Sequence, residues 1–497
     1  MTEDIIVDFD HFNFKYEDRD DQCLSNINLK IHKGECIVLT GSSGSGKTTI
    51  TRCINGLIPT FYEGCISGKC TVCNMDIEEH ETGDFAPYIG SVFQDPRSQF
   101  FTLHTQTEIA FPGENLGIRR DILQNNYTKS VTELKIEHLI DKKIFNLSSG
   151  EKQSVALASV YAADVKVYVL DEPSANLDFA STKQLQNVLG LLKAAGHTII
   201  ISEHKLYYLK DIADRFVILK NGKITETIPS DELNSRNPEW FETTGIRQPD
   251  LANIRCTPVT IPPCAHTFHR LDAENLSFGY HRRNILWHDV SFSCESGDIV
   301  GIVGKNGAGK STLLRVLMGL EKERSGRIFI NNSKTSPKTR RNQSFYVMQD
   351  VDYQLFSGSV LQEMLLGHEK ERDGPEKAGA ILNTFQLKKY ENVHPSTLSG
   401  GQKQRLSIAL SCMSDSSLLF FDEPTSGLDS ENMKLVRSEI IEQASHNKII
   451  FVITHDYEFA SSLFTSLLVI NEDQTITRIT PEQYQPELLS TIFKMED

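Results

Sequence analysis

The sequence of 497 residues lacks an apolar run long enough to cross a bilayer. Its longest apolar stretches, such as Thr198–Ile201 and Ile449–Ile453, have the length of a strand and end at polar residues. The first residues, Met1–Asp4, include two acidic side chains and lack the basic start and apolar core of a signal peptide. We therefore expect a cytoplasmic chain that reaches a membrane only through a partner.

A surplus of positive charge is also missing. Lys and Arg number 51 against 66 Asp and Glu, which gives a net charge of −15. Phosphate backbones are bound by clustered Lys and Arg, so no nucleic-acid partner is expected. The ten cysteines are scattered, as in a reduced cytosolic protein, and the one local group, Cys65, Cys70 and Cys73, lacks a fourth ligand for zinc.

What the sequence does contain is an internal repeat. Four segments return in the same order: GSSGSGKTT (Gly41–Thr49) as GKNGAGKST (Gly304–Thr312), LSSGEKQ (Leu147–Gln153) as LSGGQKQ (Leu398–Gln404), the DEP segment ending at Asp178 as that ending at Asp429, and ISEH (ending at His204) as ITH (ending at His455). The separation is 251 residues for three residue pairs: Ser148 and Ser399, Asp171 and Asp422, His204 and His455. Such order and spacing indicate a tandem duplication of an α/β domain.

The proposed boundary follows from proline-containing pairs that interrupt any periodic pattern, such as Asn237-Pro238 and Pro262-Pro263. We predict a first domain over residues 1–240, a linker over 241–264 and a second domain over 265–497. The linker lacks the long charged helical pattern of a rigid arm.

Two segments fit the phosphate-loop pattern, Gly41-x4-Gly46-Lys47-Thr48 and Gly304-x4-Gly309-Lys310-Ser311. Each follows an apolar strand (Cys36–Leu39, Ile299–Val303) and precedes a predicted helix (Ile50–Leu57, Leu313–Leu320). Glycines let backbone N–H groups surround phosphates at the start of a helix. The residues expected to bind ATP here are Gly41, Ser42, Gly44, Gly46, Lys47, Thr48 and Thr49, and in the second copy Gly304, Asn306, Gly307, Gly309, Lys310, Ser311 and Thr312.

Two buried strands, Val165–Leu170 and Leu418–Phe421, each end in Asp-Glu. Asp171 and Asp422 are predicted to hold Mg²⁺ with Thr48 and Ser311, and Glu172 and Glu423 to act as general bases on the attacking water. A lone Asp-Glu after a strand is more often a solvated turn, but the repetition and the spacing favour function. His204 and His455, which follow apolar strands, are predicted to contact the γ-phosphate.

The serine-glycine segments Ser148, Ser149, Gly150 and Ser399, Gly400, Gly401 open predicted helices. Each alone would be read as a helix N-cap. Together with the other motifs they resemble the ABC signature, and both halves resemble ABC ATPase domains from end to end.

The resemblance implies the fold, the cofactors and the site. The expected fold class is α/β, with two tandem P-loop NTPase domains of ABC ATPase type, each having a mainly parallel core sheet, an antiparallel β subdomain and a helical subdomain. The cofactors are ATP and Mg²⁺. Facing head to tail, the halves would share two ATP sites, one built from Lys47, Thr48, Gln94, Asp171, Glu172 and His204 with Ser399, Gly400 and Gly401, the other from Lys310, Ser311, Gln349, Asp422, Glu423 and His455 with Ser148, Ser149 and Gly150.

Three further pairs of residues have family roles. Gln94 and Gln349 would contact Mg²⁺ or the attacking water, and Asp178 and Asp429 match a loop at the contact between the halves. Tyr16 and Tyr280 match the position where the family stacks an aromatic ring on adenine, although isolated tyrosines are more often packing residues.

The glutamine segments SVFQDPRSQFFT (Ser91–Thr102) and YVMQDVDYQLFS (Tyr346–Ser357) resemble those of energy-coupling-factor importers of vitamins, their precursors, cobalt or nickel. Val351 replaces a proline of the pattern, and Gln99 and Gln354 have the alternative role of capping the next element. The subfamily implies a transmembrane scaffold, a separate substrate-binding membrane subunit, and peripheral association at the cytoplasmic face.

Two alternatives stay open. One is the ATPase of another ABC importer. The other is a soluble tandem ABC ATPase acting on ribosomes or nucleic acid; one such branch needs a cysteine-rich N-terminal region, whereas only Cys23 and Cys36 precede the first phosphate loop.

Overall fold

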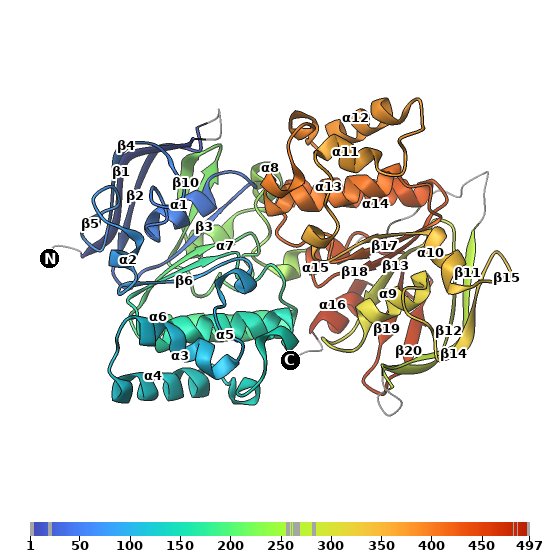
Figure 1. Cartoon of the computed structure of the whole chain (residues 1–497), viewed down its shortest axis with the longest axis horizontal. Helices are drawn as coiled ribbons and strands as arrows, with labels where there is room; N and C mark the ends of the chain where they lie inside the picture. The colour runs from blue at the N-terminus through green and yellow to red at the C-terminus, as the bar shows by residue number, and fades with distance from the viewer. Residues whose placement is uncertain are drawn as a thin grey trace. The chain divides into compact units, whose positions relative to one another are not determined.

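The computed structural model describes residues 4–17, 22–254, 259, 261, 269–280, 285–480, 482–484 and 486–494. The chain divides into two compact units, Met1–Asn253 and Ile254–Asp497, coloured blue to green and yellow to red in Figure 1. Helix α8 (Pro238–Thr244) continues past residue 240, where the sequence prediction ends the first domain, and part of the predicted linker lies outside the described residues.

Each unit is built on a six-stranded core sheet, in the order β10-β9-β3-β8-β7-β6 in the first and β16-β17-β18-β13-β19-β20 in the second. The neighbouring strands are parallel except at one edge, where β10 pairs with β9 and β20 with β19 in antiparallel fashion. The strands are β3 (Cys36–Gly41), β6 (Ile89–Val92), β7 (Val167–Asp171), β8 (Thr198–Ser202), β9 (Arg215–Lys220) and β10 (Lys223–Pro229), then β13 (Ile299–Val303), β16 (Ser344–Val347), β17 (Leu418–Asp422), β18 (Ile449–Ile453), β19 (Ser466–Ile470) and β20 (Ile476–Ile479).

The core sheet is buried on both faces. Along β3, Cys36 and Val38 belong to one hydrophobic core, whereas Ile37 and Leu39 belong to another on the opposite face. This division follows from the alternation of side chains along a strand, and it explains why the strand sequences are continuously apolar.

A smaller antiparallel sheet accompanies each core sheet, in the order β2-β1-β4-β5 or β12-β11-β14-β15. Its strands are β1 (Ile5–Tyr16), β2 (Leu24–His32), β4 (Gly64–Val72) and β5 (Met75–Asp76), then β11 (Arg270–Phe278), β12 (Trp287–Glu295), β14 (Ser325–Ile330) and β15 (Ser333–Lys334). The predicted α/β fold class with antiparallel β subdomains is confirmed.

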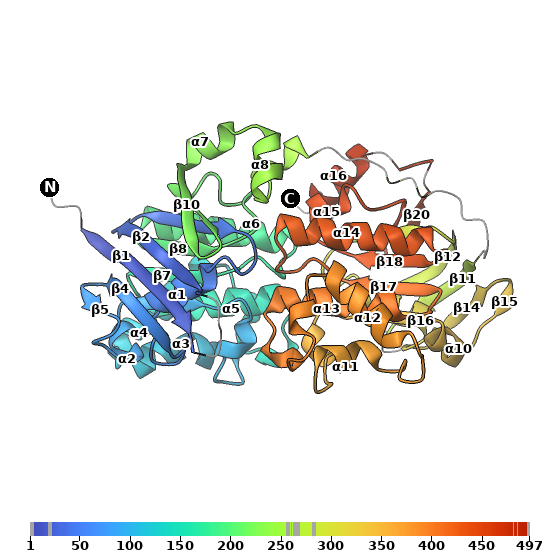
Figure 2. The ribbon, with the colours of Figure 1, turned by 90° about the horizontal axis from the view of Figure 1, so that it is seen from above.

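The helices of the first unit are α1 (Lys47–Ile54), α2 (Thr82–Phe85), α3 (Thr105–Asn115), α4 (Arg120–Glu133), α5 (Ser149–Ala162), α6 (Phe179–Ala194), α7 (Ser230–Ser235) and α8. Those of the second are α9 (Lys310–Met318), α10 (Pro337–Asn342), α11 (Val360–Leu365), α12 (Gly374–Thr384), α13 (Gly400–Met413), α14 (Ser430–Ser445), α15 (Tyr457–Ala460) and α16 (Pro486–Lys494). Helices α3 and α4 pack on α5, and α11 and α12 pack on α13, which forms the predicted helical subdomain in each unit (Figure 1, Figure 2). Within the described ranges, no helix has the length and apolarity needed to cross a membrane.

The predicted starts of two helices are wrong. Helices α1 and α9 begin at Lys47 and Lys310, three residues before the predicted Ile50 and Leu313. The preceding glycines, Gly46 and Gly309, are N-caps with left-handed φ angles of 102° and 98°, so the helix begins directly after them. The last residues of each phosphate-loop motif therefore belong to the first turn of the helix.

Candidate functional site: two nucleotide-binding centres

Each phosphate loop connects the first strand of the core sheet to a helix, and the lysine side chain of the motif is hydrogen-bonded to the loop. Lys47 Nζ donates to the carbonyl oxygens of Gly41 and Ser42, both at 3.0 Å. Lys310 Nζ donates to those of Gly304 at 2.6 Å and Lys305 at 3.0 Å. The lysine thus occupies loop carbonyls and leaves the loop N–H groups for an anion, as the pattern predicts.

The first glycine of the loop is required by a close backbone contact. Gly41 has a φ of 139°, and a Cβ there would lie 2.0 Å from the carbonyl oxygen of Leu219 on β9. Gly304 has a similar conformation, with a φ of 151°, and a Cβ there would lie 2.9 Å from the carbonyl oxygen of Ile470. A larger residue would move the loop away from the sheet edge.

The aspartates that end β7 and β17 lie beside the first helical residues. Thr48 Oγ1 donates to Asp171 Oδ1 at 3.3 Å, and Ser311 hydrogen-bonds Asp422. Burial and then the neighbouring Glu172 raise the pKa of Asp171 to about 6, and burial raises the pKa of Asp422. A carboxylate beside a hydroxyl in each half is the all-oxygen donor set that suits Mg²⁺, so these residues fit the predicted metal. A bound cation would favour the ionised carboxylates.

The glutamates predicted to act as general bases follow these aspartates and share an unusual backbone conformation. Glu172 and Glu423 have left-handed φ angles of 44° and 52°. Their N–H groups donate to the next strand, to Ser202 O at 2.8 Å and to Ile453 O at 2.9 Å. Non-glycine residues adopt this region at a cost of about 1–2 kcal/mol, and such strain concentrates at functional sites.

The predicted histidines and one glutamine contact these glutamates. His204 Nε2 lies 3.5 Å from Glu172 Oε1, and Gln94 Nε2 donates to Glu172 Oε2 at 2.7 Å. His455 Nε2 lies 3.5 Å from Glu423 Oε1. Gln349 is exposed in the corresponding loop of the second half.

The glutamine loops are closed by the residues that follow them. Gln99 Oε1 accepts from Phe93 N at 2.9 Å, and Gln354 Oε1 accepts from Met348 N at 3.3 Å. Both side chains therefore reach back to the end of the preceding strand and fix the loop that carries Gln94 or Gln349. This is a local structural role, different from capping the next element.

The signature serines are helix caps. Ser148 accepts from Glu151 N while Glu151 Oε2 accepts from Ser148 N, and Ser399 and Gln402 form the same capping box. Glu151 therefore completes the capping box, as the glutamine of the family pattern would. Ser149, Gly150, Gly400 and Gly401 form the first turns of α5 and α13. Their backbone N–H groups make these helix starts suited to an anion.

The two tyrosines lie against the phosphate loops. Tyr16 OH is 3.2 Å from Thr49 Oγ1, and Tyr280 OH is 3.0 Å from Thr312 Oγ1. Arg52 Nη1 also donates to Tyr16 OH at 2.9 Å, and burial raises the pKa of that phenol. Tyr280 is the more exposed ring of the pair, with 52% of its surface accessible.

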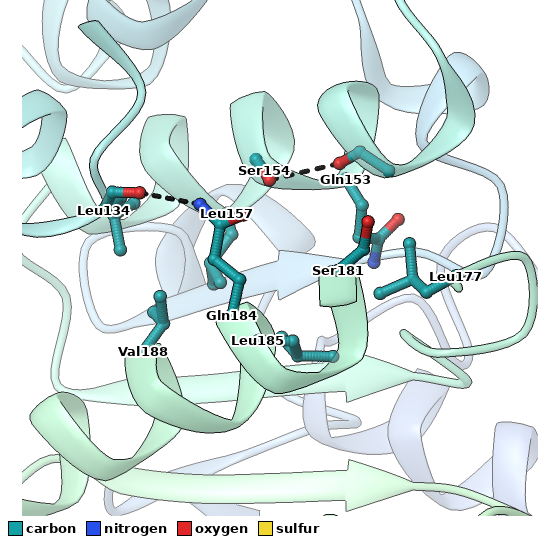
Figure 3. Close-up of a pocket in the computed structure, with 10 residues that line it drawn as sticks. Leu134, Gln153, Ser154, Leu157, Leu177, Ser181, Gln184, Leu185 and Val188 are labelled. Atoms are coloured by element: carbon teal, nitrogen blue, oxygen red, sulfur yellow. Dashed lines mark hydrogen bonds between the residues drawn. The ribbon is translucent and has the colours of Figure 1, made fainter. Parts of the chain in front are cut away.

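A small pocket lies behind the first signature segment, between α5 and α6 (Figure 3). Gln184 Nε2 donates across it to Leu134 O at 2.9 Å, and Ser154 Oγ donates to Gly150 O at 3.1 Å. Gln153 reaches into the same space, and its buried Nε2 has no hydrogen-bond partner in the described part of the chain. Its counterpart Gln404 donates to the carbonyl oxygen of Glu423 at 3.4 Å.

Sequence reasoning missed two buried glutamates. Glu108 Oε2 accepts from Thr102 N at 2.7 Å, and Glu363 Oε2 accepts from Ser357 N at 2.6 Å, so each fixes the segment that follows a glutamine loop. Their positions, 255 residues apart, match the separation of Gln94 and Gln349. The repeat itself was the signal that could have found them.

Comparison with known proteins agrees with this architecture. A family model described as ABC transporter matches residues 24–175 and 287–426. An ABC transporter ATP-binding protein of Treponema denticola is 39% identical over 477 residues, which cover 95% of this chain and 97% of the relative. A Bacillus subtilis protein named for HMP/thiamine import, YkoD, is 32% identical over 495 residues, covering 94% of this chain and 90% of the relative.

Among solved structures, a chain from a ribosome-bound complex of archaeal Pelota and ABCE1 matches with a TM-score of 0.67 at 18% identity, covering 97% of this chain and 80% of that chain. At that identity the likeness shows the fold alone. The family model and the full-length relatives go further, because they match this chain in sequence across both halves. The chain belongs to the ABC transporter ATPases and carries two tandem ABC ATPase domains in one polypeptide.

Proposed function

We propose that this chain is the ATP-hydrolysing subunit of an energy-coupling-factor importer, bound at the cytoplasmic face of the membrane to a transmembrane scaffold. A separate membrane subunit would bind the solute. The observation that carries the proposal is an exposed apolar surface fixed directly behind each glutamine loop.

In the first half this surface consists of Phe101, Leu103 and Phe145. Phe101 and Phe145 are 76% and 77% exposed. The segments that carry them are joined, because Ile144 N donates to Leu103 O at 3.0 Å. Phe101 also stacks on Phe111, with ring centroids 5.0 Å apart. Large exposed apolar groups held in place by buried hydrogen bonds are typical of a surface that a partner covers.

The second half presents a comparable surface at Tyr353, Phe356 and Val393. Phe356 is 70% exposed, and its N–H donates to the buried Glu363 at 3.0 Å, as the N–H of Phe101 does to Glu108. Two matching apolar surfaces on a duplicated chain suit a membrane scaffold that offers an apolar element to each half.

The same loop connects this surface to the chemistry. Gln94 holds the carboxylate of Glu172, and only the closed loop to Gln99 separates it from Phe101. A displacement of the loop by a partner would therefore move a group that contacts the general base. This connection supports coupling of hydrolysis to movement of a docked scaffold.

For the reaction itself we propose the following roles. Lys47 and Lys310 bind the β- and γ-phosphates. Glu172 and Glu423 accept the proton of the attacking water, oriented by Gln94 and Gln349, and His204 and His455 stabilise charge on the γ-phosphate. Thr48 with Asp171, and Ser311 with Asp422, would hold Mg²⁺, which when bound would neutralise phosphate charge.

We further propose that each ATP is enclosed by both halves, with Ser399, Gly400 and Gly401 completing the first site and Ser148, Ser149 and Gly150 the second. Tyr16 and Tyr280 would stack on the adenines. Binding of two ATP molecules closes the halves, because the closed state alone offers both sets of contacts. The solute class expected from the glutamine-loop pattern, vitamins and their precursors or metal ions, includes the import activity for which the Bacillus subtilis relative is named.

The test is purification from membranes in mild detergent. The wild-type chain should recover a scaffold and a small hydrophobic solute-binding subunit. Phe101→Asp combined with Phe145→Asp should lose both while keeping ATP binding. Leu191→Asp, which charges an exposed apolar residue on α6 that lies outside this surface, is the matched control. Recovery of ribosomes in place of membrane proteins would overturn the proposal.

A further inference from the structure

Asp422, the residue proposed to bind Mg²⁺ in the second half, is hydrogen-bonded to a residue of a neighbouring strand. Strand β16 runs parallel to β17 with Tyr346 opposite Phe420, and Asp422 stands two residues further along. Side chains two residues apart project from the same face of a sheet. Tyr346 is therefore placed to reach along that face, and its hydroxyl donates to Asp422 Oδ2 at 3.1 Å.

Two contacts fix this tyrosine. Its carbonyl oxygen accepts from Gln354 Nε2 at 3.0 Å, which anchors the backbone at the start of the glutamine loop. The guanidinium of Arg315 on α9 faces the same hydroxyl. A guanidinium only donates, so it can interact only with the phenol oxygen, and the phenol proton is directed to Asp422.

The first half arranges the equivalent residues differently. Ser91 occupies the matching place on β6, opposite Val169 and two residues before the level of Asp171. A serine hydroxyl is too short to span that distance along the strand. Asp171 instead accepts a hydrogen bond from Thr48 Oγ1 at 3.3 Å.

The equivalent arginine also has a different partner. Arg52 stands five residues after Lys47, as Arg315 stands five after Lys310. Arg52 Nη1 donates to Tyr16 OH at 2.9 Å, and its guanidinium lies 3.9 Å from the centre of the Tyr62 ring. One arginine therefore supports the proposed adenine position of the first site, and the other supports the aspartate of the second.

We propose that Tyr346, fixed by Arg315, is a positioning residue that orients the Asp422 carboxylate for the Mg²⁺ of the second ATP site, and that Ser91 gives the first site no equivalent support. The hydrogen bond from the phenol to Oδ2 restricts rotation of the Asp422 carboxylate. The orientation of its other oxygen, Oδ1, is therefore fixed as well. The two ATP sites then differ in the affinity for the divalent cation, with the second site the tighter. The inference rests on the proposed role of Asp422 as a metal ligand, and is independent of any transport partner.

The experiment uses the full chain with Glu172→Gln and Glu423→Gln, so that ATP is bound and not consumed. The protein is given two equivalents of ATP and titrated with Mn²⁺, and bound Mn²⁺ is measured by its electron paramagnetic resonance signal against an ATP-only titration. In this background Tyr346→Phe should weaken one Mn²⁺ site about tenfold, the effect of one charge-assisted hydrogen bond. Ser91→Ala should leave both sites unchanged, and Asp422→Asn should remove the site that Tyr346→Phe weakens.

ATP affinity measured in EDTA should be the same for Tyr346→Phe and its parent, which separates metal positioning from a folding defect. If Tyr346→Phe does not yield folded protein, Arg315→Gln is measured in its place and should weaken the same site. Unchanged Mn²⁺ affinity in the tyrosine variant, with one site lost in Asp422→Asn, overturns the positioning role. Two unchanged sites in Asp422→Asn overturn the metal role on which the inference rests.

Discussion

The helices that follow the two signature segments are packed by different residues at the same place. In the second half, Arg405 on α13 is buried, and its Nη1 donates to Asn432 Oδ1 on α14 at 2.5 Å. In the first half, Ser154 and Ser181 occupy the two matching positions, 251 residues earlier, and both line the pocket in Figure 3. The motif is kept in both halves while the contact behind it has changed.

The balance between burial and pairing explains why either arrangement, the Arg405–Asn432 contact or the two serines, is compatible with stable packing of the helices. Burial lowers the pKa of Arg405, and the nearby Asp429 opposes that effect. A buried ion and its partner gain little net stability over a neutral contact, but removing one member leaves the other unpaired. In the second half, the contact between α13 and α14 therefore adds little net stability, whereas the removal of one partner is expected to destabilise the packing strongly. In the first half, both matching positions are occupied by serine.

The largest expected effect tests whether the two halves are equivalent in catalysis. Glu172→Gln and Glu423→Gln, made separately, should each reduce ATP turnover about 10²-fold or more, because each removes a general base from a cooperating pair of sites. Steady-state phosphate release measures this. Full activity in either variant would show that only one half hydrolyses.

The lysine of each phosphate loop is the next most sensitive position. Lys47→Ala or Lys310→Ala should weaken ATP binding to its own half by about 10²-fold, since a buried ammonium that pairs with phosphate is lost. Binding of a fluorescent ATP analogue, counted per chain, reports each half. Normal binding and cleavage in the double variant would contradict the assignment of both sites.

The packing difference itself predicts a smaller effect. Arg405→Ser should lower the free energy of unfolding of the second half by about 2 kcal/mol, because the buried Asn432 amide loses its partner. Urea unfolding, with hydrogen–deuterium exchange to identify the half that opens, measures the loss.

The matched control for that change is the double variant Arg405→Ser, Asn432→Ser, which copies the first half and leaves no buried amide unpaired. It should lose less stability than Arg405→Ser alone. An equal or greater loss would show that the contact between the helices depends on volume and not on the hydrogen bond.

The smallest effect is expected at the signature residue that differs between halves. Ser149→Gly should change stability by less than about 0.5 kcal/mol, because Ser149 is exposed and the corresponding Gly400 has no atom within 4 Å of the place of a Cβ. ATP turnover of the variant tests whether the serine affects closure on the second ATP. A large change in turnover would place Ser149 against the partner half.

Much of the fold and site could be predicted because the motifs are local. An apolar strand followed by Asp-Glu, or by the glycines around Lys47, predicts that the residues after the strand lie at the edge of the sheet. Because each motif occurs twice, a chance match is implausible. Asp171, Glu172 and His204 are accordingly brought together with Gln94 in the first half.

What could not be predicted depends on contacts between distant segments. The reach of Tyr346 to Asp422 requires the strand order β16-β17 and its register, which no local pattern encodes. Gly46 forms the left-handed cap that sets the start of α1, and a Cβ there would lie 2.6 Å from Leu24 Cδ2, a contact with a distant segment that the motif does not encode. The repeat aligns Arg405 with Ser154, but it does not show that Asn432 on α14 is the partner of Arg405.

The left-handed backbone at Glu172 and Glu423 has a consequence for how such duplicated enzymes diverge. Replacing either glutamate by glycine would abolish its chemistry and at the same time relieve about 1 kcal/mol of conformational energy. This relief offsets the entropy that glycine adds to the unfolded chain, so the fold offers little resistance to inactivation of one half by such a substitution. We therefore expect that the presence of both glutamates reflects a demand for turnover in each half, which the separate Glu172→Gln and Glu423→Gln variants test.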